Sequence, residues 1–227
     1  MLSNFEQAAQ ANATNVDTYV MLARGYYFLA DGHYGFEADK DKAKKALMLE
    51  NFEKGVAAAE RGLFVASPDF AAKMKAKVKV IDALDALKAA DMPLLYWYAV
   101  NLGKWARAKG TTTILFWKGT VKKAVEKVLD LAPAYWYGAA DRYLGALYSI
   151  LAGMMGGDKA KSKAHFEASL KRAPNYFGKR MQDRKNFDAT LDEVLKGSAD
   201  ADPDIAPEQK TEQRRAEDVR KRADDIF

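Results

Sequence analysis

The stretch of sequence that decides the fold is AYWYGAADRYLGALYSILAGMMGGDKAKSKAHFEASLKRAPNY, from Ala134 to Tyr176. Its apolar residues recur at helical spacing on both sides of a glycine-rich corner, and a proline and an aromatic residue close it. The pattern predicts two helices packed as a hairpin. The spacing is typical of a tetratricopeptide repeat, through Leu144, Gly145 and Tyr148 in the first helix and Ser162, Phe166, Ser169 and Pro174 in the second.

The predicted hairpin combines close packing with an enlarged corner. Small side chains at Gly145 and Ser169 let the two helices approach, while Tyr148 and Phe166 fill the space between them. The corner reads Met-Met-Gly-Gly-Asp from Met154 and is longer than the repeat consensus requires. Insertions of this kind gather on one face of a repeat protein, which is often the binding face.

A second signal recurs along the chain: a proline followed two residues later by an aromatic. It occurs at Pro68, Pro133 and Pro174, each time after a helical pattern that the proline ends. The recurrence predicts an all-α fold, a tetratricopeptide-like α-solenoid of about three divergent helical hairpins plus a C-terminal helix. Residues 1–197 form the predicted helical domain. Residues 198–227 are predicted to be an extended linker and a charged helix that packs on the body or on a partner.

Two stretches of the remaining helical pattern are ambiguous. Residues 73–80 alternate with period two, as a strand does, but apolar residues from Met74 to Leu87 follow the helical period for longer, so we expect a helix. Residues 111–117 are rich in β-branched residues and are compatible with a short strand. No second strand exists to pair with it, so we expect a helix capped by Thr112 or Thr113, with Phe116 and Val121 facing inward.

Composition excludes several classes of protein. The 227 residues, 49% of them apolar, are enough for a sizeable core. A net charge of +5, with acids and bases mixed along the chain, predicts a solvated surface and no nucleic-acid partner. The absence of cysteine rules out disulfides and thiol chemistry. No window approaches the roughly 20 apolar residues of a membrane span, and no signal-peptide pattern follows Met1.

The sequence lacks the common catalytic and cofactor motifs. The two histidines, His33 and His165, lack metal-ligand spacing, and no Walker loop, nucleophile elbow or dinucleotide fingerprint is present. A residual enzyme hypothesis rests on Asp141 beside Arg142. We therefore expect no cofactor, no metal and no catalysis.

Aromatic residues are dense in two stretches, Tyr96 to Trp105 and Tyr135 to Tyr148. Any one of them is explained by core packing, but the density favours a cavity for the group, because aromatic rings give much contact area at low conformational cost. The predicted ligand-lining residues are Tyr96, Trp97, Trp105, Arg142, Tyr143, Tyr148 and Met154.

The chain resembles a known family, the T component of TRAP transporters. The resemblance rests on LLYWYA from Leu94, GAADRYLGALY from Gly138, Gly156-Gly157-Asp158 with the following Ala160, Ala164, His165 and Phe166, Pro174-Asn175-Tyr176, and the closing helix with Ala206-Pro207-Glu208, Arg215-Ala216-Glu217 and Phe227. It covers residues 19–227. An Arg-Tyr-Leu-Gly helix joined to a Gly-Gly-Asp corner is its most specific part.

This resemblance implies a periplasmic lipoprotein, anchored through an N-terminal cysteine, that works with the substrate-binding P component of a TRAP system. It also implies a pore through the helical body, a homotrimer, and a small hydrophobic or organic-acid ligand. The missing cysteine fits a mature form that begins after the anchor. The alternative interpretation is a general repeat scaffold that binds a protein segment in its concave groove.

Overall fold

The computed structural model describes residues 2–151, 153, 156–172 and 184–221, and these form helices and turns without any strand. The all-α fold class is thereby confirmed. The α-helices are α1 Leu2–Ala11, α2 Val16–Gly32, α3 Lys42–Ala66, α4 Pro68–Lys75, α5 Val80–Ala83, α6 Met92–Lys109, α7 Thr111–Leu131, α8 Tyr135–Ile150, α9 Lys159–Arg172, α10 Arg184–Lys196 and α11 Ala206–Lys221. Short 3-10 turns are η1 Tyr34–Phe36, η2 Leu84–Ala86 and η3 Ala89–Asp91.

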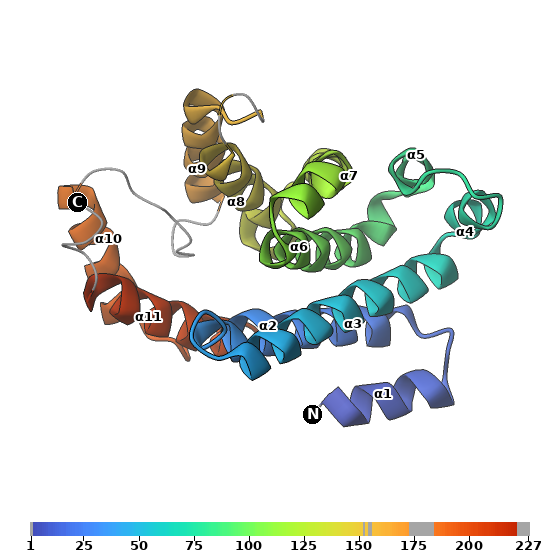
Figure 1. Ribbon diagram of the computed structural model, residues 1–227, viewed down its shortest axis with the longest axis horizontal. Coiled ribbons are helices and arrows are strands. Elements are labelled where there is room, and N and C mark those ends of the chain that lie inside the picture. Colours follow the sequence, from blue (N-terminus) through green and yellow to red (C-terminus); the bar gives the residue numbers. More distant parts are fainter. Residues whose placement is uncertain (1, 152, 154–155, 173–183, 222–227) are drawn as a thin grey trace.

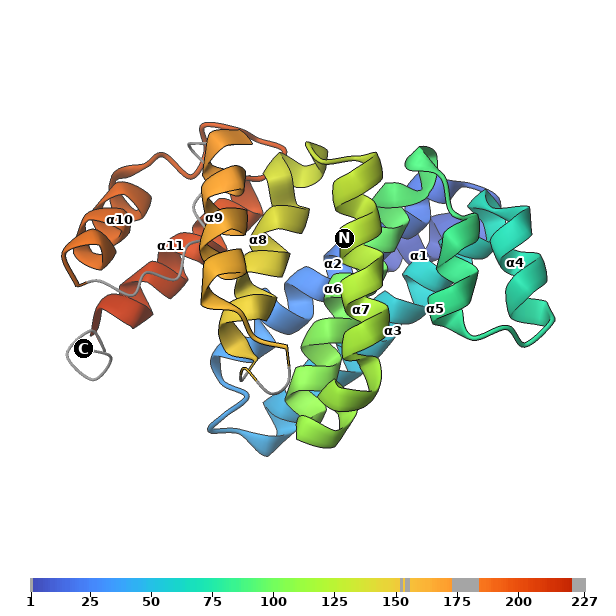
Figure 2. The same cartoon turned by 90° about the horizontal axis from the view of Figure 1, so that it is seen from above.

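The longer helices pair as hairpins, α2 with α3, α6 with α7 and α8 with α9. The α2–α3 pair forms one layer, and α6 packs across it with α7, α8 and α9 beyond (Figure 1). Helices α4 and α5 lie at one end of the molecule and α10 and α11 at the other (Figure 2). That these hairpins are tetratricopeptide-like repeats stays a prediction, as does a domain boundary at residue 197.

Helix α6 is the centre of the core because it is apolar on most of its sides and has neighbours on most of them. It packs against α2, α3, α7 and α8. Its buried residues include Leu94, Leu95, Trp97 and Tyr98, and Phe52 of α3 is also fully buried. Fully burying one such side chain contributes roughly 1.5–3 kcal/mol, so this helix fixes the positions of its partners.

Helix ends follow local sequence chemistry. Asn15 caps α2 by accepting a hydrogen bond from the Thr18 backbone N–H. Helix α3 ends at Ala66, as the proline signal predicts. Pro68 also opens α4, where its missing N–H is not needed.

The lysine-rich stretch corrects one prediction. A single helix from Met74 to Leu87 is wrong, because α4 ends at Lys75 and α5 begins only at Val80. Lys77 between them takes a left-handed conformation with φ 58°. Lysines at every second position would lie on two opposite sides of a helix, and Val78 stays exposed, so little apolar burial would offset the cost of helix formation.

The start of α7 corrects a second prediction. Neither threonine caps the helix, which begins at Thr111 after Gly110 with φ 119°, and no strand forms. Phe116 does not face inward and is 75% exposed, whereas Val121 is buried as predicted. The two are five positions apart in sequence, which places them about 140° apart around the helix.

The segment before α11 corrects a third prediction. Residues 198–205 are not an extended linker but a series of turns, with hydrogen bonds from Ala201 N to Ser198 O and from Ile205 N to Asp202 O. Ile205 is only 3% exposed. Its burial fixes the segment that leads into α11.

The α8–α9 hairpin packs closely, as predicted. A Cβ added at Gly145 would lie 3.0 Å from the Phe166 ring, so any larger residue would press against this ring. Ser162 Oγ donates to Gly145 O at 2.8 Å, and Ser169 Oγ donates to Gly138 O at 3.4 Å. Met154 and Met155 of the corner, and Pro174, lie outside the described residues. Within the described parts of the chain, no helix has the length and apolar character needed to cross a membrane.

Candidate functional site

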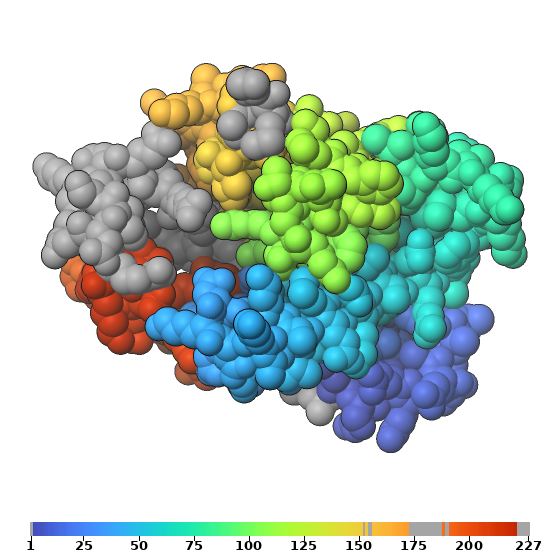
Figure 3. Space-filling view, in the orientation of Figure 1, coloured from blue at the N-terminus to red at the C-terminus, as the bar shows by residue number. Residues whose placement is uncertain are grey.

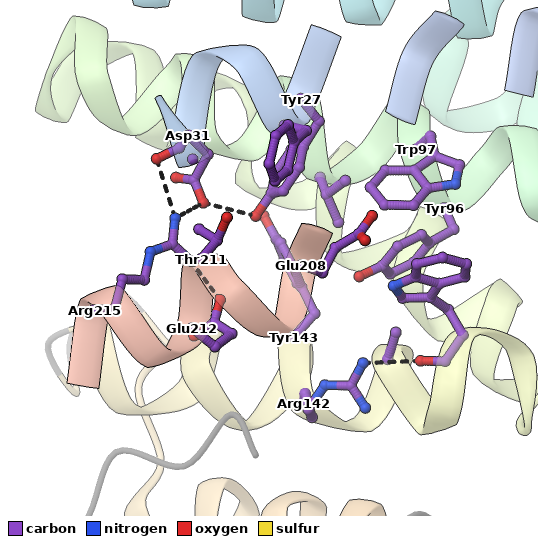
Figure 4. Close-up of a pocket in the computed structure, with 15 residues that line it drawn as sticks. Tyr27, Asp31, Tyr96, Trp97, Arg142, Tyr143, Glu208, Thr211, Glu212 and Arg215 are labelled. Carbon is purple, nitrogen blue, oxygen red and sulfur yellow. Dashed lines mark hydrogen bonds and ion pairs between the residues drawn. The ribbon is translucent and has the colours of Figure 1, made fainter. Parts of the chain in front are cut away.

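A cavity of about 240 Å³ lies between α2, α6, α8 and α11 (Figure 4). A more open hollow of about 450 Å³ adjoins it on α2 and α11 and shares Phe28, Gly32 and Thr211 as wall residues. In the space-filling view the surface is hollowed where α8 and α11 face each other (Figure 3). The cavity is lined by Tyr27, Phe28, Asp31, Gly32, Tyr96, Trp97, Val100, Trp136, Ala139, Arg142, Tyr143, Glu208, Thr211, Glu212 and Arg215.

One wall of the cavity is aromatic and centred on Trp97. Its ring centroid lies 5.1 Å from Tyr96, 5.6 Å from Tyr27 and 5.6 Å from Trp136, in tilted or edge-to-face contacts. Trp97 Nε1 donates to Tyr135 Oη at 3.0 Å, and burial raises the pKa of Tyr135 to about 12. The indole N–H is therefore satisfied on the protein side, which leaves a largely apolar surface toward the cavity.

Trp136 reaches this wall through an unusual turn. Trp136, Tyr137 and Gly138 take left-handed conformations with φ of 48°, 58° and 70°, so the right-handed part of α8 begins only after them. A bulky residue rarely adopts this conformation, because it costs about 1–3 kcal/mol unless its surroundings enforce it. The predicted continuous helix from Ala134 is wrong at this point.

Arg142 helps to hold this turn in its left-handed conformation. Its guanidinium donates to Trp136 O at 2.8 Å and to Tyr137 O, and the Tyr137 hydroxyl donates to Asp202 Oδ2 at 2.6 Å. Charge-assisted bonds of this kind are stronger than neutral ones. Arg142 thus positions the turn that carries Trp136 into the cavity wall.

An ion-pair cluster closes the α2–α11 side of the cavity (Figure 4). Asp31 Oδ1 accepts from Lys104 Nζ at 2.8 Å, and the other oxygen accepts from Arg215 and from the Tyr27 hydroxyl. Burial alone would raise the pKa of Asp31, but the Lys104 and Arg215 charges hold it well below its ordinary value. Arg215 also pairs with Glu212 at 2.6 Å.

Glu208 forms the second link between α11 and α2. Its Oε1 pairs with Arg24 Nε at 2.7 Å, and the Arg24 guanidinium lies 4.3 Å from the Trp136 ring centroid. Arg24 also donates to Asp204 O at 2.6 Å. The other carboxylate oxygen, Oε2, is buried and has no hydrogen-bond partner among the described residues.

The predicted lining residues divide into three groups. Tyr96, Trp97, Arg142 and Tyr143 all line the cavity. Trp105 and Tyr148 lie elsewhere: Trp105 Nε1 donates to Glu53 Oε1 at 2.7 Å, and Tyr148 stacks on His165 with ring centroids 5.7 Å apart. Met154 is outside the described residues. That any of these residues binds a ligand remains a prediction.

Sequence reasoning missed the charged part of this wall. Asp31, Glu208 and Arg215 were not selected, because a charged helix is normally a solvated one. Arg24 and Glu208 are 184 positions apart, and no local pattern indicates that α11 returns to α2. The sequence did contain a signal for Trp136, because it belongs to the same aromatic run as Tyr143.

Of the two residues in the residual enzyme hypothesis, Asp141 belongs to an ion-pair cluster, whereas Arg142 binds the Trp136 turn. Asp141 is 2% exposed and pairs with His165 Nδ1 and Arg172 Nε, both at 2.9 Å. Both links join α8 to α9. Over the described ranges, no group of three or more His, Asp or Glu side chains is arranged to hold a metal ion.

Two comparisons with known proteins bear on which family the chain belongs to. The chain matches a family model described as TRAP transporter T-component over residues 1–227. A search of curated proteins finds no match.

Proposed function

The chain belongs to the TRAP transporter T-component family, a family of transport accessory proteins, and we propose from this premise that it binds a small ligand in the cavity between α2, α6, α8 and α11. The proposal rests most on one observation: an aromatic wall centred on Trp97 that is closed by charged residues of α11. Small-molecule sites combine apolar and aromatic surface with placed polar groups, and this cavity contains both.

Within this proposal, Tyr96, Trp97 and Tyr143 contact the apolar body of the ligand, and Arg142 keeps Trp136 in place. The ligand is small and hydrophobic, or an organic acid. The protein docks the periplasmic solute-binding P component, acts as a homotrimer, and is held at the membrane by a lipid anchor. No catalytic step is proposed.

The docking part is tested with the solute-binding P component of the same transport system. Isothermal titration calorimetry of the two purified proteins is expected to show association. An unrelated periplasmic binding protein serves as the control and is expected to give no heat. Equal heats with both proteins, or no heat with either, would remove the support for docking.

A second candidate function follows from the open hollow on α2 and α11, which is lined by Phe28, Pro207 and Arg214 among others. A shallow hollow beside a repeat body suits a bound protein segment, as the scaffold alternative requires. The two functions differ in what Arg214→Ala does, because Arg214 lines the hollow but not the cavity: loss of P-component binding with retained small-molecule binding favours the scaffold.

A further inference from the structure

Glu208 is an acidic residue of the cavity wall whose hydrogen bonding is incomplete among the described residues. Its carboxylate points from α11 toward Tyr96 and Trp97 (Figure 4). Only Oε1 has a partner, Arg24 at 2.7 Å, whereas Oε2 is buried without one among the residues that the structure describes. A carboxylate can accept several hydrogen bonds, and leaving a buried oxygen unpaired is costly.

Asp31 shows how a carboxylate of the same cavity is fully satisfied. It accepts from Lys104, from Arg215 and from the Tyr27 hydroxyl, so both of its oxygens are used. Glu212, also in the wall, pairs with Arg215 at 2.6 Å. Of these three acids, Glu208 alone presents a buried oxygen without a partner in the part of the chain that the structure describes.

We infer that the ligand of this cavity carries a hydrogen-bond donor, an ammonium or a hydroxyl group, on an apolar body, and that the donor binds Glu208 Oε2. This inference rests on the proposed function. Because Oε2 is buried, an entering molecule without a donor leaves this oxygen unpaired in the bound state. Sites built in this way discriminate strongly against analogues that lack the donor.

The charges around Oε2 argue against an anionic head group at this position. The cavity wall carries Asp31, Glu208 and Glu212, and Arg24, Lys104 and Arg215 beside them pair with these acids. Arg142 also lines the cavity, and its guanidinium donates to Trp136 O and Tyr137 O. The rings of Trp97 and Tyr96 in front of Glu208 suit a cation or a neutral apolar body. Of the two ligand classes in the proposed function, the hydrophobic one is therefore favoured over the organic acid.

Four probes that share one apolar body test this inference by calorimetry: 4-phenylbutylamine, 4-phenylbutanol, 4-phenylbutyl methyl ether and 5-phenylpentanoate. The amine and the alcohol are expected to bind at least tenfold more tightly than the ether and the carboxylate. Glu208→Met is expected to abolish this preference. Glu217→Gln, at an exposed glutamate of the same helix that does not line the cavity, is the matched control and is expected to retain it.

The outcomes separate the inference from the proposed function. If the ether or the carboxylate binds as tightly as the alcohol, or if Glu208→Met keeps the preference, the donor inference is overturned while the ligand cavity stands. If none of the four probes binds, both the inference and the ligand-binding part of the proposed function fail. Circular dichroism of each variant shows whether it is folded before its binding is interpreted.

Discussion

Replacing Arg215 with methionine tests how α11 is held on the body. Arg215 joins α11 to Asp31 at the end of α2, and it is 30% exposed while Asp31 is 13% exposed. Asp31 keeps Lys104 and Tyr27 as partners, so the variant removes one cation from a carboxylate that remains largely buried. Methionine preserves the apolar part of the arginine side chain.

The size of the effect follows from the geometry. A hydrogen bond to a charged group contributes about 1.5–3 kcal/mol, and partial exposure of Arg215 places this one near the lower end. A loss of about 1.5–2 kcal/mol raises the population of undocked α11 roughly 10- to 30-fold. The remainder of the core, centred on α6, does not depend on this contact.

Hydrogen exchange of the α11 backbone measures this opening directly. Arg215→Met is expected to lower protection in α11 and in the residues 198–205 turns, with little change in α6. Lys210→Met is the matched control, because Lys210 pairs with Asp200 on the surface and both side chains are more than half exposed. Equal protection of α11 in Arg215→Met and in the unmodified protein would refute the reasoning.

Three further predictions follow from the packing. Because the pKa of Asp31 is lowered in the native protein, its ion pairs stabilise the protein fully above the ordinary pKa of 3.8. The urea midpoint is therefore expected to fall as the pH drops below about 4. This fall is expected to be less steep in Asp31→Asn. Gly145→Ala pushes a methyl group against Phe166 and is expected to cost about 1–3 kcal/mol in urea unfolding, whereas Gly119→Ala meets only ordinary contacts and is not expected to destabilise. Arg142→Met removes two bonds that hold the left-handed turn and is expected to cost about 2–4 kcal/mol and to alter the near-ultraviolet circular dichroism of Trp136; an unchanged spectrum would contradict its positioning role.

Much of the helical body was predictable because its helices carry long periodic patterns. The apolar stripes of α2, α3 and α6 indicate both their extent and their buried faces. The α8–α9 contact was predictable because Gly145 opposite Phe166 is a signature of close packing. Errors arose where the periodicity was short, as at Lys77, or where a residue lay off the stripe, as Phe116 does.

The candidate site was only half predictable. Its aromatic wall stands out in sequence because Trp97 and Tyr143 belong to dense aromatic runs. Its charged wall does not, because Asp31 and Arg215 meet only when α11 returns across 184 positions, and contacts at such separation leave no local pattern. The left-handed turn at Trp136 was also hidden, since neither tryptophan nor tyrosine favours that conformation.

The most direct test of ligand binding in this cavity uses the four tryptophans of the chain as internal reporters. Trp97 and Trp136 line the cavity, whereas Trp105 and Trp117 lie outside it. In a nitrogen-15 correlation spectrum with the four indole signals assigned, titration with 4-phenylbutanol is expected to shift the signals of Trp97 and Trp136 and to leave the other two in place. Shifts confined to Trp105 and Trp117, or no shift at any tryptophan, would contradict the account.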